Sequence, residues 1–309
     1  MITIGYITSR KEPQIEWFLD SLVSQEGDLS LIKEIVIVSF AAPYGDPIPP
    51  SQSFDLAGFT VRAFPPKPTV WAGPHRLTKE DWWAASNARN TWLCLANQPW
   101  SVALDDRCVL VPGWLKSIEE AIKGNYAVFG SYEKRSGMKV EGGVIVEPGV
   151  TTGVDSRETW CKEQGRTMPM AKAPPEWSYG CNMAFPTAWG MEVNGWDETC
   201  DGCSAEDSIF GMMLANCGKR LRYDYRMKII EDRTPGCCDP VMIRRDKGVS
   251  PKDKSHAQLE LLRRLKRSRH QWDLPSVRTE YIKTGKWPIP TGPTHDWYDG
   301  QPLSEMTAT

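Results

Sequence analysis

The sequence predicts an α/β fold, in which a doubly wound, mostly parallel sheet is flanked by helices and followed by a helical and irregular C-terminal extension. Three observations support this prediction. Residues 2–8 alternate and are rich in β-branched side chains, residues 13–25 carry apolar residues at helical spacing, and residues 35–38 are continuously apolar. Strand, helix and strand in this order form the βαβ unit of a parallel sheet, whose inner strands are buried on both faces.

The remaining expected elements continue this alternation along the chain. We expect a loop at 42–50, strands at 59–64 and 102–104, helices at 79–95 and 114–122, strands at 126–131 and 143–146, a helix at 205–217 and a strand at 225–230. Residues 153–175 are polar and contain prolines, which predicts a mobile excursion. Residues 256–269 predict a basic amphipathic helix, and the proline-rich tail after residue 283 predicts an irregular end.

Composition and charge are those of an ordinary globular protein. Of the 309 residues, 40% are apolar and 25% are charged, which is the usual balance. No run approaches the roughly 18 to 20 apolar residues of a membrane span, and the N-terminus enters a strand rather than a signal peptide. The nine cysteines are an odd number and fit reduced thiols better than a disulfide framework. We therefore expect a cytoplasmic protein with no transmembrane segment.

The most informative segment is 103–115, ALDDRCVLVPGWL, in which an apolar strand ends on Asp105 and Asp106. In open α/β sheets, ligands bind beyond the carboxyl ends of the strands. A divalent cation that holds a diphosphate is ligated by carboxylates projecting from rigid backbone. The segment therefore predicts a metal-and-nucleotide site. Taken alone, an Asp pair is more often a turn or helix cap, so the residues around it decide between the two interpretations.

Residues 88–115 resemble the nucleotide-binding half of the family 2-like, GT-A fold glycosyltransferases. In those enzymes an Ala-Arg-Asn helix start is followed, at this spacing, by an apolar strand, an Asp-rich turn and Pro-x-Trp-Leu. The positions in register are Ala88, Arg89, Asn90, Leu93, Ala96, Leu104, Asp105, Asp106, Pro112, Trp114 and Leu115. Agreement over this many positions is more specific than the Asp pair alone and favours the ligand site.

Residues 195–221 resemble the acceptor-side motif of the same family, in which Gly-Phe-Asp-Glu leads through a glycine-containing loop to Glu-Asp at a helix start. The matching positions are Gly195, Asp197, Glu198, Gly202, Glu206, Asp207 and the helix through Leu214. The resemblance covers about residues 1–230. It implies a catalytic domain over 1–235, with a nucleotide-binding half (1–115) and an acceptor-side half (116–235), followed by a basic helix and irregular tail over 236–309.

The chemistry of sugar transfer explains why carboxylates recur in both blocks. The departing diphosphate must be neutralised, which a carboxylate-bound metal and a cationic side chain can do. Asp105 and Asp106 suit this task. A base must also take the proton of the acceptor hydroxyl, and Asp207 suits that one. Glu206 and Asp207 begin a predicted helix, whose dipole favours their ionised forms. The alternative interpretation is that both residues have no catalytic role and are simply acids of a first helical turn.

The resemblance implies roles for individual residues. Asp106 would bind Mn²⁺ or Mg²⁺, Asp105 would lie near the ribose or the diphosphate, and Asp207 would be the general base of an inverting reaction, with Glu206 beside it. The further candidate contacts to the nucleotide sugar are Thr8, Arg10, Arg89 and Asn182. For Arg89, a solvated helix cation is as good an interpretation as a nucleotide contact.

The chain departs from the family pattern at several positions. Arg107 stands where a third Asp is often found, which weakens the metal prediction. Ser39 and Phe40 follow the second strand, where the family usually has an Asp that reads the base. No downstream His is an obvious further metal ligand. The candidates for that ligand are Asp232, Glu231 and His256.

Cysteines and basic residues offer further interpretations. Cys200 and Cys203, with Cys217 or with Cys237 and Cys238, have zinc-site spacing, although unlinked thiols are favoured. Residues 241–270 hold ten Lys or Arg against three Asp or Glu. Such a run is usually a solvated helix face. Residues 244–269 are nonetheless a candidate contact for nucleic acid or an anionic surface.

We therefore expect an enzyme that transfers a hexose from a nucleotide sugar, with a UDP-sugar such as UDP-glucose favoured, to a hydroxyl on a glycan, a protein or modified DNA. One alternative is a phage-type DNA glycosyltransferase that acts on a hydroxymethylated base. Alternatives of other classes are a non-catalytic sugar- or nucleotide-binding protein on the same fold and a nucleotidyltransferase. The sequence does not identify the acceptor, the donor sugar or the oligomeric state.

Overall fold

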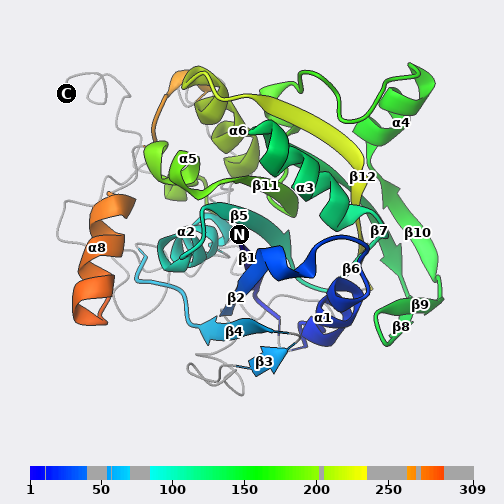
Figure 1. Cartoon of the computed structure of the whole chain (residues 1–309), viewed down its shortest axis with the longest axis horizontal. Coiled ribbons are helices and arrows are strands. Elements are labelled where there is room, and N and C mark those ends of the chain that lie inside the picture. Colours follow the sequence, from blue (N-terminus) through cyan, green and yellow to red (C-terminus); the bar gives the residue numbers. More distant parts are fainter. Residues whose placement is uncertain are drawn as a thin grey trace, which may run out of the picture.

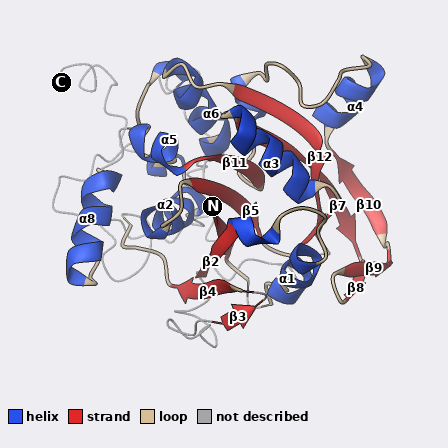
Figure 2. Ribbon diagram, viewed as in Figure 1, coloured by secondary structure: helices blue, strands red, loops and turns tan. Residues whose placement is uncertain are grey.

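The computed structural model describes residues 1–10, 12–39, 54–56, 58–69, 84–201, 205–234, 263–268 and 273–288. Its centre is a 10-stranded sheet with the order β3-β4-β2-β1-β5-β11-β7-β12-β6, and β10 pairs with β7 beside this path (Figures 1 and 2). Two further strands, β8 and β9, form a separate small sheet. The strands are β1 (Ile2–Thr8), β2 (Ile32–Ser39), β3 (Phe54–Leu56), β4 (Phe59–Phe64), β5 (Trp100–Asp105), β6 (Cys108–Leu110), β7 (Ala127–Ser136), β8 (Lys139–Glu141), β9 (Val144–Glu147), β10 (Val150–Val154), β11 (Asn182–Pro186) and β12 (Leu221–Asp232).

Most strands of the large sheet run in one direction. β4, β2, β1 and β5 are parallel neighbours, and β7 and β12 are parallel to each other. β11 lies between β5 and β7 and is antiparallel to both, so those two strands also share a direction. The register pairs Thr8 with Ser39 and Ile7 with Asp105. The carboxyl ends of β1, β2 and β5 therefore meet at one edge, and the predicted α/β fold class is confirmed.

Helices cover both faces of the sheet (Figure 1). α1 and α3 pack on one face through Phe18 and Trp114, and α2, α5 and α6 pack on the other through residues such as Trp92 and Phe210, while α8 packs against α2. The helices are α1 (Ile15–Val23), α2 (Ala85–Leu95), α3 (Trp114–Gly124), α4 (Ser156–Glu163), α5 (Thr187–Glu192), α6 (Glu206–Asn216) and α8 (Leu274–Thr284), with short 3₁₀ turns at Leu29–Leu31, Pro175–Trp177 and Glu198–Cys200.

The position of α2 is set by close contact with β1. Every residue of β1 is buried, and a Cβ added at Gly5 would overlap the ring of Trp92. Trp92 also makes edge-on contact with Trp196, with ring centroids 5.7 Å apart. Only glycine at position 5 lets α2 approach the sheet this closely, and this approach brings Arg89 to the edge where β5 ends.

The segment 153–175 differs most from its predicted structure. It contains α4, which begins after Asp155, and the Asp155 side chain accepts from the backbone N–H of Arg157 as an N-cap. Arg157 and Cys161 are buried. The prediction of an irregular segment is therefore wrong over α4. The sequence does not reveal this helix because a buried charged residue, rather than an apolar stripe, holds its inward-facing side.

The other predicted elements differ in their boundaries or fall outside the described residues. β7 continues to Ser136 and β12 begins at Leu221, so both are longer than expected. Residues 42–50 and 79–83 lie outside the described residues. Within the predicted basic helix, only 263–268 are described. Of these, 263 and 264 are helical and 265–268 are not. The helix α8, which no sequence pattern indicated, packs Leu274 into the core.

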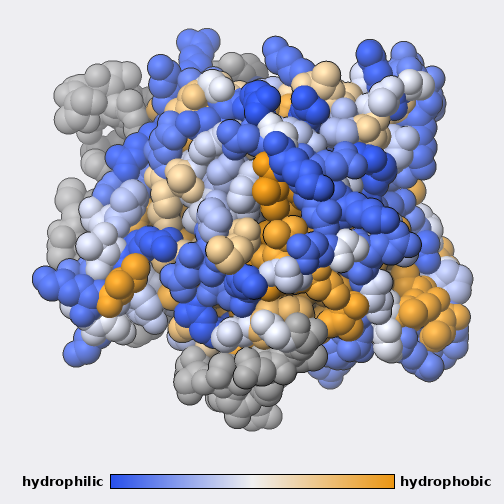
Figure 3. Space-filling view, in the orientation of Figure 1, coloured by the Kyte–Doolittle hydropathy of each residue, from blue (hydrophilic) through white to orange (hydrophobic). Residues whose placement is uncertain are grey.

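The surface is mixed in hydropathy. In the space-filling view, hydrophobic residues gather on the right, over the arm that contains β8 and β9 (Figure 3). β9 and β10 expose valines, with Val144 61% and Val150 69% exposed. None of the helices in the described part of the chain combines the length and the apolar character needed to span a bilayer.

Candidate active site

Arg89 connects the two sequence blocks that were predicted to form one site. It lies on α2 with 3% of its side chain exposed, and its Nη2 donates to Asp105 Oδ1 at 2.9 Å. Its Nη1 lies 3.1 Å from Glu206 Oε1 and 3.0 Å from Asp207 Oδ1. One guanidinium therefore holds the carboxylate that ends β5 against both carboxylates that begin α6, although Arg89 and Glu206 are 117 positions apart in the chain.

Asp207 lies in the first turn of α6, after Ala205 has turned the chain with a φ of 74°. Its Oδ1 is buried and, among the described residues, has no hydrogen-bond donor in good geometry. Burial raises the pKa of Asp207 to about 7. The charge of Arg89 opposes this rise, and Glu206 adds to it. The side chain keeps 21% exposure, so the carboxyl group can exchange protons with a ligand near neutral pH.

Asp106 follows β5 and is held by two residues at the end of β1. Arg10 Nε lies 3.0 Å from Asp106 Oδ1 and 2.9 Å from Oδ2, and the Thr8 hydroxyl donates to Oδ2 at 2.6 Å. Burial raises the pKa of Asp106 to about 6, while Arg10 and the Thr8 hydroxyl act in the opposite direction. The structure thus brings the candidate residues Thr8, Arg10 and Asp106 together, and they contact one another.

Arg107, at the position of the frequent third Asp, points its side chain toward α1. Its φ is 56°, and its guanidinium lies 5.2 Å from the ring centre of Trp17. Arg107 Nη2 lies 2.5 Å from Asp232 Oδ2, and the Thr234 hydroxyl donates to Asp232 Oδ1 at 2.6 Å. The candidate metal ligand Asp232 is therefore engaged in an ion pair with Arg107.

Glu231 precedes Asp232 on β12, so its side chain points to the opposite face. Its Oε2 accepts from Arg233 Nε at 3.0 Å and from Nη2 at 2.6 Å, while its buried Oε1 has no hydrogen-bond partner among the described residues. Burial acts to lower the pKa of Arg233. The negative charges of Glu231, Asp105 and Asp106 outweigh this effect and raise that pKa above its ordinary value. Glu231 pairs with Cys108 in the sheet, and the backbone N–H of Asp232 donates to Arg107 O at 3.0 Å, so the end of β12 that carries Glu231 and Arg233 lies beside the Asp pair.

Asn182, a candidate sugar contact, lies inside the sheet. Its Nδ2 donates to Ser131 O at 2.8 Å and to Met227 O at 2.7 Å. Its Oδ1 accepts from Trp114 Nε1 at 2.9 Å. The amide therefore joins β11 to β7, β12 and α3, and both of its N–H groups are used within the protein.

Residues 197–201, which belong to the acceptor-side block, contact α2 rather than the open edge of the sheet. Glu198 Oε1 lies 2.5 Å from the buried Lys67 Nζ and accepts from Asn90 Nδ2 at 2.9 Å. Asp201 Oδ1 accepts from the backbone N–H of Ser86 at 2.6 Å, and its Oδ2 accepts from that of Asn87 at 3.2 Å. These acids cap and position the helix that carries Arg89.

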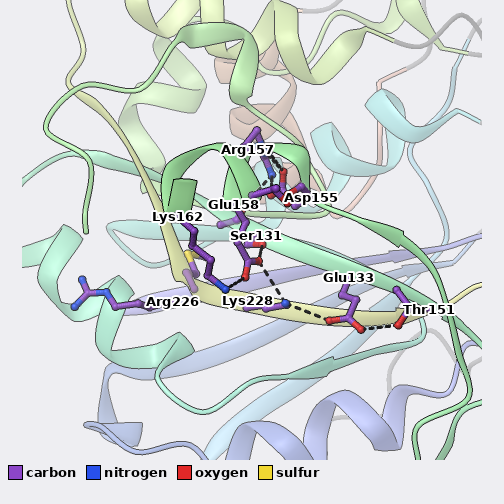
Figure 4. Close-up of polar contacts among 12 residues, drawn as sticks. Ser131, Glu133, Thr151, Asp155, Arg157, Glu158, Lys162, Arg226 and Lys228 are labelled. Atoms are coloured by element: carbon purple, nitrogen blue, oxygen red, sulfur yellow. Dashed lines mark hydrogen bonds and ion pairs between the residues drawn. The ribbon is translucent and has the colours of Figure 1, made fainter. Parts of the chain in front are cut away.

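A buried arginine that the sequence analysis did not identify lies beside the same site. Arg157 Nη2 donates to Asp155 Oδ2 at 2.7 Å and to Gly130 O at 2.9 Å, and its guanidinium lies 3.9 Å from the ring centre of Tyr179. Figure 4 shows Arg157 against Asp155, with the Ser131–Glu158 and Lys228–Glu133 contacts along β7 and β12. Arg157 fixes the chain just before Gly180. A single arginine in a polar segment leaves no periodic signal in the sequence.

The described residues do not supply a divalent-cation site as they stand. They contain no group of three or more His, Cys, Asp or Glu residues arranged to hold a metal ion, and Asp105, Asp106 and Glu231 each have an arginine partner. His256 lies outside the described residues, as do Cys203, Cys237 and Cys238. Cys200 is buried, and most of its partner cysteines in the zinc interpretation lie outside the described residues, so that interpretation is not tested. The metal assignment stays a prediction.

Gly180 packs directly against the side chains of Arg89 and Asp207. A Cβ at this position would overlap Asp207 Oδ1 and lie 2.5 Å from Arg89 Cζ. We expect Gly180→Ala to destabilise the protein by about 1–3 kcal/mol, as overpacking does, and to displace both side chains. Urea unfolding measures the change. Gly153→Ala is the control, because its Cβ would meet Lys134 at an ordinary 3.7 Å. Equal stability losses in the two variants would contradict this packing.

Comparison with known proteins identifies the fold. No family model and no curated protein sequence matches the chain. Among solved structures, GalNAc-T7 with UDP, GalNAc and Mn²⁺ superposes with a TM-score of 0.51 at 12% identity, over 82% of this chain and 46% of that one. TarS 1-349 from S. aureus gives 0.49 at 12% identity, over 75% of this chain and 60% of that one. The matched region is thus less than two thirds of either neighbour, and the chain has the GT-A glycosyltransferase fold.

Proposed function

We propose that this protein is an inverting glycosyltransferase that transfers a hexose from a nucleotide sugar, with a UDP-sugar favoured, to an acceptor hydroxyl. The observation that carries the proposal is the contact of Arg89 with Asp105 on one side and with Glu206 and Asp207 on the other. This contact brings the carboxylate that ends β5 next to a second pair of carboxylates, which supports a shared site at the carboxyl edge of the parallel strands. The first side suits donor binding, and the second suits proton removal.

The proposed reaction uses Asp207 as the general base. The acceptor oxygen attacks the anomeric carbon while its proton moves to the Asp207 carboxylate. The bond from the anomeric carbon to the diphosphate oxygen breaks, and its electron pair leaves with the diphosphate. Attack from the face opposite the leaving group inverts the anomeric configuration. A carboxyl group whose pKa is raised to about 7 is a stronger base than an ordinary Asp and is still largely ionised above neutral pH.

Donor binding falls to the residues at the ends of β1 and β5. Asp105 lies at the end of β5, where its Oδ1 accepts a hydrogen bond from Arg89. A carboxylate held in this way suits a hydrogen bond from a ribose hydroxyl. Next to Asp105 in the chain, Asp106 forms a connected group with Thr8 and Arg10. Fold-level likeness supports a nucleotide-sugar donor, since GalNAc-T7 was crystallised with UDP.

A donor screen with product analysis tests the proposal. The protein is incubated with UDP-, GDP- and dTDP-hexoses, with water as the acceptor, and release of the nucleoside diphosphate is measured. We expect turnover with at least one α-linked donor and, by proton NMR, early appearance of the β-sugar. The absence of both turnover and a thermal shift with every donor would contradict glycosyl transfer, and early appearance of the α-sugar would contradict inversion.

A further inference from the structure

On the donor side of the site, each carboxylate is paired with an arginine. Three carboxylates face this region, and each forms an ion pair: Asp105 with Arg89 at 2.9 Å, Asp106 with Arg10 at 2.9 Å, and Glu231 with Arg233 at 2.6 Å. Of these arginines, Arg89 is shared with Glu206 and Asp207. A divalent cation that used Asp106 as a ligand would have to displace Arg10, which faces both of its oxygens.

Asp106, which the family resemblance implies as the metal ligand, shows the difficulty most clearly. Both of its oxygens are within 3.0 Å of Arg10 Nε, and Oδ2 accepts a second hydrogen bond from Thr8. Hard divalent cations need several oxygen ligands with free lone pairs. The oxygens of Asp106 are directed at a neighbouring cation and a hydroxyl, so Asp106 in this arrangement does not fit the role of ligand to the implied ion.

Arg233 is the cation best placed to meet a ligand at this edge. It follows β12, and its backbone N–H donates to Arg135 O at 2.6 Å. This hydrogen bond holds the backbone from which the Arg233 side chain extends. Glu231 binds Nε and Nη2, which, among the described residues, leaves the Nη1 edge of the guanidinium for a ligand. The side chain is 37% exposed, in contrast to the buried Arg10 and Arg89.

We infer that Arg233 binds the diphosphate of the donor and that this binding needs no divalent cation. The inference rests on the proposed function and specifies how its donor site neutralises phosphate charge. Guanidinium groups bind phosphate oxygens through paired hydrogen bonds in a planar geometry. Glu231 orients the guanidinium of Arg233 through Nε and Nη2. The opposite edge of the guanidinium can then donate hydrogen bonds to the phosphates.

The same strand offers a closely matched control. Arg226 also pairs with an acid two residues before it, through Nη2 to Asp224 Oδ2 at 2.7 Å, and its side chain is 40% exposed. It also contacts Glu120 of α3, on the side of the sheet away from Asp207. Arg226→Gln therefore removes an arginine of similar exposure and pairing from β12 without removing one from the donor site.

Calorimetric titration with UDP, GDP and dTDP as probes tests the inference on the full chain. We expect one of them to bind in EDTA, with a Kd that changes less than threefold when saturating Mn²⁺ replaces EDTA. Arg233→Gln should raise that Kd about tenfold to a hundredfold, as loss of a charge-assisted hydrogen bond does. Arg226→Gln should leave it unchanged, and Arg233→Lys should lie between them. Circular dichroism checks that each variant is folded.

The outcomes separate this inference from the function on which it rests. Binding that is seen only with Mn²⁺, or an unchanged Kd in folded Arg233→Gln, would overturn the inference and leave glycosyl transfer standing. If Arg233→Gln does not fold, protection of Arg233 from phenylglyoxal by UDP in the wild-type protein decides, and no protection overturns the inference. The absence of binding by every probe in both conditions would overturn the proposed function as well.

Discussion

Asp207→Asn is expected to lower the rate of sugar transfer by about 10²- to 10⁴-fold, the usual contribution of a general base. The variant keeps the size and polarity of the side chain but can no longer accept the proton of the acceptor hydroxyl. Binding of the donor nucleotide should change little, because Asp105 and Arg89 remain in place. Initial rates of nucleoside diphosphate release and calorimetric binding of UDP measure the two effects.

Ser208→Ala is the control for this variant. Ser208 lies next to Asp207 on α6, and its exposed hydroxyl donates to Glu176 O at 3.3 Å, so its loss should leave the rate unchanged. Transfer by Asp207→Asn at more than a tenth of the wild-type rate would show that another group takes the proton.

The pH dependence of the wild-type rate follows from the same residue. Burial raises the pKa of Asp207 to about 7, and only the ionised carboxylate can act as a base. We therefore expect kcat/KM to rise about tenfold for each pH unit below 7 and to level off above it. Donor hydrolysis measured between pH 5 and 9 checks this. A profile that is flat between pH 5.5 and 7.5 would contradict the assignment.

The second large effect is expected from Arg89→Gln, which should lower the free energy of unfolding by about 3–5 kcal/mol. Arg89 is the common partner of Asp105, Glu206 and Asp207, so its loss leaves three carboxylates close together without a counter-ion. Their pKa values should rise, so the folded variant binds more protons than its unfolded chain. Its stability should therefore fall further as the pH rises from 6 to 8.

Urea unfolding at pH 6 and pH 8 measures the effect of Arg89→Gln. Lys116→Gln serves as the control, because the ion pair of Lys116 with Glu26 is exposed on both sides and such pairs contribute about 0–1 kcal/mol. A loss below 1 kcal/mol in Arg89→Gln, or a loss that shrinks toward pH 8, would contradict the role of Arg89 as the shared counter-ion.

The sequence predicted the parts of the fold that repeat a local pattern. The apolar runs of β1 and β2 and the helical spacing of α1 give the βαβ opening, and the two motif blocks indicated that Arg89, Asp105, Glu206 and Asp207 belong to one site. The structure brings these four side chains into contact. Their chemical roles remain predictions, because contact in the folded chain does not by itself demonstrate catalysis.

What the sequence did not predict depends on pairing between distant residues. Arg157 carries no periodic signal, yet it is buried against Asp155 and Tyr179. The acids of the second block divide in a way that their spacing does not reveal: Glu198 and Asp201 anchor α2, whereas Asp207 reaches Arg89. A carboxylate in a motif can bind either a ligand or a helix, and only the three-dimensional neighbours distinguish the two.

The cap that Asp201 places on α2 also limits how the chain can fold. The residue before α2, Ala84, offers no side-chain cap, and the cap comes instead from a residue 115 positions later. Contacts this distant in sequence form late, because closing a long loop is costly in entropy. Residues 1–115 alone therefore lack the side-chain cap of α2. The start of the helix that carries Arg89 is completed only when the second half of the chain packs against it, which couples the position of Arg89 to the loop that precedes Asp207.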